Sequence, residues 1–120
     1  MAVKKQQYNL ELVRGRDFTQ QFTLSNKETG AALNISSYTL KSEIRKSMKI
    51  ASTLLVEGGF SIDDSQAASG IFVLSLTDTQ TLALTDSKGY YDIVFTVGGI
   101  SESWFWGEVT IIDLPTDIST

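Results

Sequence analysis

The segment that decides the fold of this chain is YYDIVFTVGGISESWFWGEVTIIDL, residues 90–114. It consists of two apolar, β-rich runs on either side of Gly98 and Gly99. Two glycines between such runs predict a β-hairpin, because a two-residue turn needs positive φ angles that glycine adopts without steric cost. Apolar and polar residues largely alternate in both arms, so one face of the hairpin should point into a core and the other mostly to solvent.

The rest of the chain repeats this pattern in shorter runs. Strands are predicted at residues 8–13, 18–24, 38–44, 52–57, 60–62 and 71–76. Thr77 and Gln80 fit a capping box, which predicts one helical turn within residues 77–84. Short strands separated by turns at intervals of about eight to twelve residues are typical of β-sandwiches and small barrels. We therefore predict an all-β fold, an antiparallel two-sheet β-sandwich of about seven or eight strands with one short helical turn.

One domain should account for the whole chain, because 120 residues suffice to bury a core without disulfides. Residues 1–7 are expected to be a flexible polar arm, residues 8–114 the sandwich, and residues 115–120 a loose tail. Pro115 should end the last strand because it lacks a backbone donor. The residues expected in the core are Leu10, Leu12, Phe18, Phe22, Leu24, Tyr38, Leu40, Ile44, Phe72, Leu74, Leu76, Leu82, Tyr91, Ile93, Phe95, Phe105, Val109 and Ile111.

The composition excludes several classes of function. The chain has no cysteine and no histidine, so disulfides, thiol nucleophiles, Ser-His triads and the usual zinc sites are excluded. No apolar run approaches the roughly 20 residues of a membrane helix. The N-terminus lacks the apolar segment of a secretory signal. We expect a protein that is made in a cytosol and has neither a cofactor nor a membrane partner.

Acidic side chains are the remaining candidates for chemistry. Asp63 and Asp64 could contribute to a calcium site, but their spacing is not that of an EF-hand, and adjacent aspartates are common in turns. Asp92, Glu102 and Glu108 lie on or near the hairpin, on polar faces where solvent is a simpler partner than a second carboxylate across a cleft. The sequence therefore predicts no catalytic residue, no metal site and no enzymatic activity.

The charges are distributed unevenly along the chain. Residues 1–49 carry nine Lys/Arg and four Asp/Glu, a net of +5, whereas residues 50–120 carry one lysine and ten Asp/Glu, a net of −9. The halves either interleave and neutralise each other, or present opposite patches that let copies associate head to tail or dock on a charged partner. Nucleic acid is not an expected partner, because the chain is acidic and no basic stretch is interleaved with aromatics.

Trp104, Phe105 and Trp106 form a run of three aromatic residues. If Phe105 faces the core, the period of two puts both tryptophans on the outer face of the strand. A loop or the edge of the sandwich could cover them, or they could anchor a protein interface, where tryptophan is enriched. Stacking on a sugar is a further alternative. Gly107 should mark a bulge or a place where another backbone segment passes close.

The interface interpretation assigns a set of residues to the contact. Trp104 and Trp106 would be its anchors, flanked by Glu102 and Glu108. A neighbouring chain or a second copy would then bring basic residues such as Lys41 and Arg45 against these carboxylates.

Seven short motifs follow one another along residues 8–114. They are YNLELVRG (8–15), GRDF (15–18), NISSYT (34–39), SEIRKS (42–47), SGIFVLSLTDTQTLAL (69–84), GYYDIVF (89–95) and GEVTI (107–111). This order resembles the small β-sandwich modules of tailed-phage structural proteins and is similar to the amino-terminal domain of phage baseplate upper proteins. The resemblance implies an immunoglobulin-like sandwich that is a component of the virion and not an enzyme.

The function expected on this basis is that of a structural component of a tailed-phage virion. Its place would be the tail, neck or baseplate, or the capsid surface as a decoration, after synthesis in the host cytoplasm. It would act through protein–protein contacts with other virion proteins and with copies of itself. The alternative is a host-surface adhesin module that binds carbohydrate through its aromatic residues.

Overall fold

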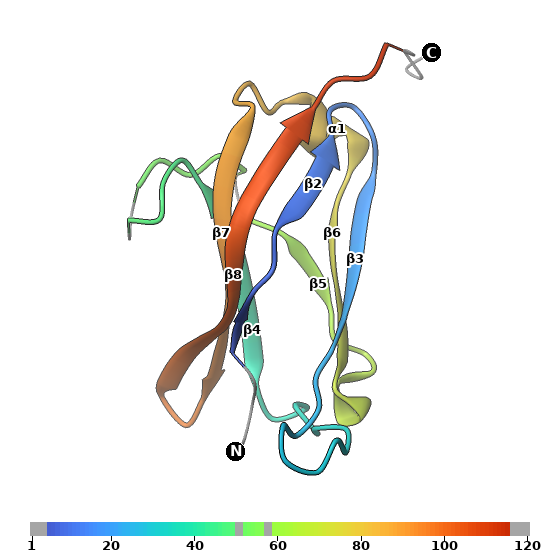
Figure 1. Ribbon diagram of the computed structural model, residues 1–120, viewed down its shortest axis with the longest axis vertical. Helices are drawn as coiled ribbons and strands as arrows, with labels where there is room; N and C mark the ends of the chain where they lie inside the picture. Colours follow the sequence, from blue (N-terminus) through green and yellow to red (C-terminus); the bar gives the residue numbers. More distant parts are fainter. Residues whose placement is uncertain (1–4, 50–51, 57–58, 116–120) are drawn as a thin grey trace.

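The computed structural model describes residues 5–49, 52–56 and 59–115. Within them, eight strands form two sheets that lie face to face, as predicted for a β-sandwich (Figure 1). The larger sheet contains β1 (Gln6–Gln7), β2 (Leu10–Val13), β4 (Thr39–Arg45), β7 (Lys88–Val97) and β8 (Ile100–Ile112). The smaller sheet contains β3 (Phe18–Thr23), β5 (Ser61–Asp63) and β6 (Ile71–Leu76), with β6 in the middle.

The predicted hairpin is the centre of the larger sheet. Gly98 and Gly99 form its turn with φ angles of 58° and 79°, which is the positive region that glycine adopts freely. β7 pairs with β4 on its other side, antiparallel, and β8 pairs with β1 and β2. The hairpin reaches beyond the other strands at one end of the molecule (Figure 1).

The N-terminal strands depart from a fully antiparallel arrangement, because β1 and β2 both run parallel to β8. Gln6 lies opposite Phe105, and Leu10 lies opposite Val109. Gln6 and Gln7, which we placed in the arm, are thus part of the sheet. Residues 1–4 of that arm and residues 116–120 of the tail lie outside the described residues. Parallel pairing of the two chain ends is a non-local contact that the local pattern does not encode.

The backbone between β1 and β2 runs alongside β8 and passes very close to it at Gly107. The Tyr8 amide donates to the Trp106 carbonyl at 2.8 Å, and the Asn9 side-chain oxygen accepts from the Glu108 amide at 3.0 Å. A Cβ at Gly107 would lie 2.3 Å from the Tyr8 carbonyl oxygen, so no other residue fits there without moving the backbone. The prediction that another backbone segment passes close to Gly107 is confirmed.

The core between the sheets is rich in aromatic rings. Phe22 and Phe72 stack with centroids 5.1 Å apart, and Phe95 meets Phe72 edge-on at 5.6 Å. Most of the expected core residues are buried or pack against the core. The buried hydrophobic residues that we did not place in the core are Leu33, Ile35, Val56, Phe60, Ala67, Leu84 and Trp104.

The helical turn is α1 (Asp78–Leu82), and its capping box is confirmed. The Thr77 hydroxyl accepts from the Gln80 amide at 3.2 Å, and the Gln80 side-chain oxygen accepts from the Thr77 amide at 2.9 Å. Leu82, which we expected in the core, is 61% exposed, whereas Thr81 and Leu84 are buried. The prediction for Leu82 was wrong because Thr81 occupies the inner side of this one turn, where its hydroxyl donates to the Arg16 carbonyl.

The connections also differ in detail from the expected elements. Of the edge strand expected at residues 52–57, the described part forms a single bridge, between Leu54 and Arg45. Residue 57 lies outside the described residues. A 3-10 turn, η1 (Ala67–Ser69), precedes β6 and buries Ala67.

Candidate binding surface

A β-bulge at Trp104 separates the two tryptophans. Ile93 lies opposite Phe105, and the next residue, Val94, lies opposite Ser103, so Trp104 is an additional residue on β8. Trp104 and Phe105 therefore both point into the core, and Trp104 is only 3% exposed. The expectation that both tryptophans lie on the outer face was wrong for Trp104, because the bulge interrupts the period of two.

Glu102 is tied to the buried tryptophan. The Trp104 Nε1–H donates to Glu102 Oε2 at 2.9 Å, and Lys5 Nζ lies 3.8 Å from the same oxygen. The indole N–H, and then the charge of Lys5, hold the pKa of Glu102 below its usual range. Glu102 lies opposite Phe95, whose side chain is in the core, so its side chain is on the core side of the hairpin. Glu102 therefore does not flank Trp106.

The other four residues of the predicted interface share one surface. In the register of the sheet, Glu43, Asp92 and Trp106 lie in one row across β4, β7 and β8. Arg45, Tyr90 and Glu108 lie in the neighbouring row. Directly opposed residues of antiparallel strands point to the same face. We call this solvent side of the larger sheet the outer face; its residues are Thr39, Lys41, Glu43, Arg45, Tyr90, Asp92, Val94, Thr96, Ser101, Ser103, Trp106 and Glu108.

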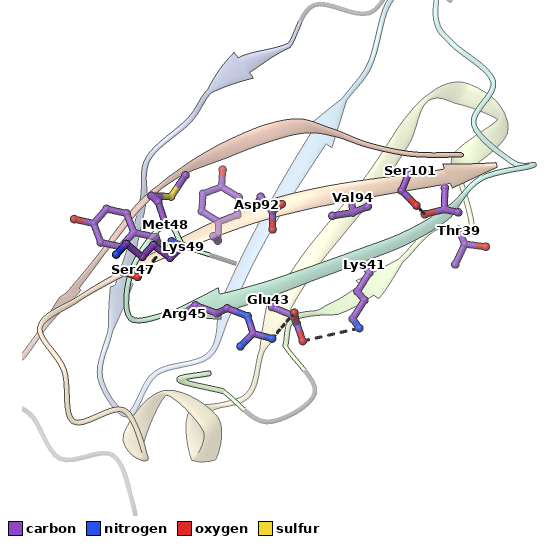
Figure 2. A pocket seen from close by; sticks show the side chains of 13 residues that line it. Thr39, Lys41, Glu43, Arg45, Ser47, Met48, Lys49, Asp92, Val94 and Ser101 are labelled. Carbon is purple, nitrogen blue, oxygen red and sulfur yellow. Dashed lines mark hydrogen bonds and ion pairs between the residues drawn. The ribbon is translucent and has the colours of Figure 1, made fainter. Parts of the chain in front are cut away.

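A groove with a volume of about 710 Å³ lies on the outer face, over β4 and β7. Figure 2 shows Met48 and Lys49, from the loop after β4, at one end of the groove and Thr39 and Ser101 at the other. Tyr90 and Val94 contribute apolar surface to its lining. Met48 is 57% exposed and adds a further apolar side chain to this lining.

Charged side chains surround this apolar surface. The Glu43 carboxylate lies between Arg45, at 3.0 Å, and Lys41, at 4.0 Å (Figure 2). The groove is lined by three cations, Lys41, Arg45 and Lys49, and by two carboxylates, Glu43 and Asp92, which gives a net charge of +1. The exposed Lys46 adds a further positive charge in the same loop.

Beside the groove, polar side chains bind one another. Lys88 and Glu108 form an ion pair at 2.9 Å, and the hydrogen bond from Lys88 together with its attraction to Glu108 raises the pKa of Lys88. The Ser103 hydroxyl donates to Asp92 Oδ2 at 2.8 Å. The carboxylates of Glu43, Asp92 and Glu108 on the outer face are thus each held by a partner from the same sheet.

Sequence reasoning missed Tyr90, Met48 and Lys49. The signal for Tyr90 was present, because its neighbour Tyr91 was placed in the core and adjacent strand residues point to opposite faces. The sequence pattern predicts no strand or helix between residues 44 and 52, and only the fold brings Met48 and Lys49 into the lining of the groove with Tyr90.

A metal site would need several clustered acidic side chains, and a membrane span would need a long apolar helix. In residues 5–49, 52–56 and 59–115, no three acidic side chains gather in a way that could hold a metal ion. The Ser65 amide donates to Asp63 Oδ1 at 3.0 Å, and this bond lowers the pKa of Asp63. The same described residues include no helix long and apolar enough to cross a membrane.

Comparison with known proteins finds similarity in structure but not in sequence. No protein-family model matches the sequence, and no curated protein matches it. Among solved structures, the chain is similar to domains 4 and 5 of the S-layer protein SbsC. The identity is 11%, the TM-score is 0.49, and the match covers 93% of this chain and 51% of that one. This chain therefore spans about half the length of the S-layer structure.

Proposed function

We propose that this chain is a non-enzymatic structural module of a tailed-phage virion that binds neighbouring virion proteins through the outer face. The observation that carries the proposal is the groove on this face, in which Met48, Tyr90 and Val94 form apolar surface beside Lys41, Arg45 and Lys49. An apolar centre with a charged border is the usual composition of a protein–protein contact. The motif order along residues 8–114 supports the assignment of the assembly to a phage particle.

The sheet presents this surface rigidly. β4 is paired with β7 along its whole length, and β7 and β8 are paired on both sides of the Trp104 bulge. The side chains in each row therefore keep their relative positions. The core beneath is closely packed, and its rings hold β7 and β8 in place. A preorganised surface loses little conformational entropy on binding, which favours a stable contact in an assembly.

Purified particles provide the test. An antibody raised against the chain should label assembled phage particles at a defined position in electron micrographs. The variant Val94→Glu, which introduces a charge into the apolar part of the groove, should fold normally but be incorporated at a greatly reduced level. Val73→Glu on the smaller sheet is the matched control and should be incorporated like the wild type. Absence of the chain from the particles, or normal incorporation of Val94→Glu, would contradict the proposal.

Carbohydrate binding is the second candidate, and the composition of the groove supports it. Tyr90 offers an aromatic surface, while Thr39, Thr96 and Ser101 offer hydroxyl groups along the same groove. An aromatic surface with a few polar groups in a concave site is typical of small-ligand binding. A glycan array followed by calorimetry on the hits distinguishes the two candidates: the adhesin predicts a sugar whose binding Tyr90→Ala abolishes, and the virion contact predicts none.

A further inference from the structure

The molecule has a second surface whose chemistry complements the groove. It lies where α1 and the end of β8 meet the turn between β2 and β3 (Figure 1). Leu82 is 61% exposed and Leu114 is 54% exposed at this end. We call this surface the α1 end; its residues are Asp17, Asp78, Leu82, Asp86, Asp113 and Leu114.

Hydrogen bonds and an ion pair bring the acidic residues of the α1 end together in two pairs, Asp17 with Asp78 and, through Arg14, Asp86 with Asp113. Asp17 Oδ1 accepts from the Asp78 amide at 2.8 Å. Arg14 Nε lies 2.7 Å from Asp113 Oδ1, and its Nη2 donates to the Asp86 carbonyl at 3.4 Å. Asp17, Asp78, Asp86 and Asp113 thus share this end of the molecule with the two exposed leucines, and with Arg14 and Arg16 its net charge is −2.

The groove has the opposite arrangement. Its apolar surface includes the exposed Met48, and the lining cations Lys41, Arg45 and Lys49 outnumber its carboxylates. The α1 end is an apolar projection with acidic neighbours, and the groove is apolar with basic neighbours. The two surfaces are therefore complementary both in apolar character and in charge. The groove lining has a net charge of +1 and the α1 end a net charge of −2, so the two surfaces are opposite in sign.

We propose that the occupant of the groove is the α1 end of a second copy of this chain. Leu82 and Leu114 of one copy would contact Met48 and Tyr90 of the next, and the carboxylates around them would face Lys41, Arg45 and Lys49. This inference rests on the proposed function in that it uses the outer face as a contact surface, and it adds the partner and the geometry of the contact.

The contact is head to tail because its two surfaces lie on different parts of the molecule. A contact between two different surfaces leaves one of each free at the ends of every assembly, so copies add until a ring closes or a filament grows. A contact of the outer face with itself would instead stop at a dimer. The two arrangements therefore predict different products.

The experiment is sedimentation velocity of the full chain over a range of protein and salt concentrations. The wild type should form species larger than a dimer at low ionic strength and should dissociate as salt is added, because the contact is partly electrostatic. Lys49→Glu in the groove and Leu82→Lys at the α1 end should each weaken self-association by about tenfold or more. Their matched controls are Lys27→Glu, in the turn after β3, and Ile100→Lys, at the hairpin tip; Lys27 is exposed and Ile100 is 66% exposed. Both controls should associate like the wild type.

Mixing the two defective variants gives the decisive result. Lys49→Glu retains an intact α1 end and Leu82→Lys retains an intact groove, so an equimolar mixture should form a one-to-one heterodimer that does not grow. Failure of the mixture to associate, when each variant alone is monomeric and folded, would overturn the head-to-tail contact. A wild type that stays monomeric up to about 1 mM would also overturn it. Incorporation of Val94→Glu into particles is measured separately, so the proposed function can stand or fall independently of this outcome.

Discussion

The indole of Trp104 stacks on the ring of Phe95 inside the sandwich, with centroids 4.2 Å apart and planes inclined by 22°. The bulge on β8 makes this contact possible, since it turns Trp104 toward the core next to Phe105. The same bulge leaves Trp106 on the outer face. One additional residue in β8 therefore places Trp104 in the core and Trp106, two positions further on, at the surface.

Replacement of Trp104 by alanine should destabilise the protein by about 3–5 kcal/mol, because it removes a large buried side chain and leaves a cavity against Phe95. Trp106→Ala is the matched control and should cost much less. Chemical denaturation of both variants measures the difference. A large loss for Trp106→Ala together with a small loss for Trp104→Ala would mean that the bulge lies elsewhere on β8.

Tyr91→Phe should destabilise the protein by about 1 kcal/mol, since the Tyr91 hydroxyl donates to the Tyr8 carbonyl at 2.6 Å and joins β7 to the N-terminal strands. Burial, and to a lesser extent Tyr8, raises the pKa of Tyr91 above its ordinary value of 10.0. Stability should therefore be fully present below that value and fall as the pH rises above it. Tyr91→Phe should lose less stability than the wild type as the pH rises, because the titrating group is gone. Tyr90→Phe, on the outer face, should lose as much stability as the wild type.

Gly107→Ala should displace the backbone between β1 and β2, because the new Cβ would overlap the Tyr8 carbonyl oxygen. We expect a loss of about 1–3 kcal/mol, as for other overpacked sites. Amide hydrogen exchange should show faster exchange in β2 than in the wild type, with β3 and β6 less affected. Thr110→Ala, at an exposed position of the same strand, is the control, and equal exchange in both variants would argue against the close approach at Gly107.

Glu102 should make stability dependent on pH in the acidic range. The Trp104 N–H and Lys5 lower its pKa below the ordinary value of 4.5 in the folded protein. The stabilisation is therefore present above that value and is lost as the pH falls through the lower folded-state pKa. Glu102→Gln keeps an oxygen acceptor for the indole but cannot titrate. Its unfolding free energy should therefore change less than that of the wild type between about pH 6 and about pH 3. Parallel curves for the two proteins would show that Glu102 is not coupled to folding.

Local sequence patterns predicted much of the architecture. Alternation in residues 90–97, the glycine pair at 98 and 99, and the capping box at Thr77 each depend on residues a few positions apart. Turn geometry and helix capping are short-range effects, so they can be inferred before the fold is known. The period of two likewise implies that Lys41 and Arg45 share one face of their strand, and the register of β4 with β7 agrees.

Contacts between distant segments decided the remaining features. The run Trp104-Phe105-Trp106 is compatible with either register, and pairing with Ile93 and Val94 determined which tryptophan is buried. Leu82 was misplaced because the orientation of a single helical turn depends on what packs beneath it, here the backbone at Arg16. The groove also exists only in the fold, since the loop carrying Met48 is brought over Tyr90 by pairing between β4 and β7. The sequence by itself determined the strands, the hairpin turn and the helix cap. The tertiary structure decided which side chains point to the core and which form the outer face, because side-chain direction depends on which distant strand supplies the partner.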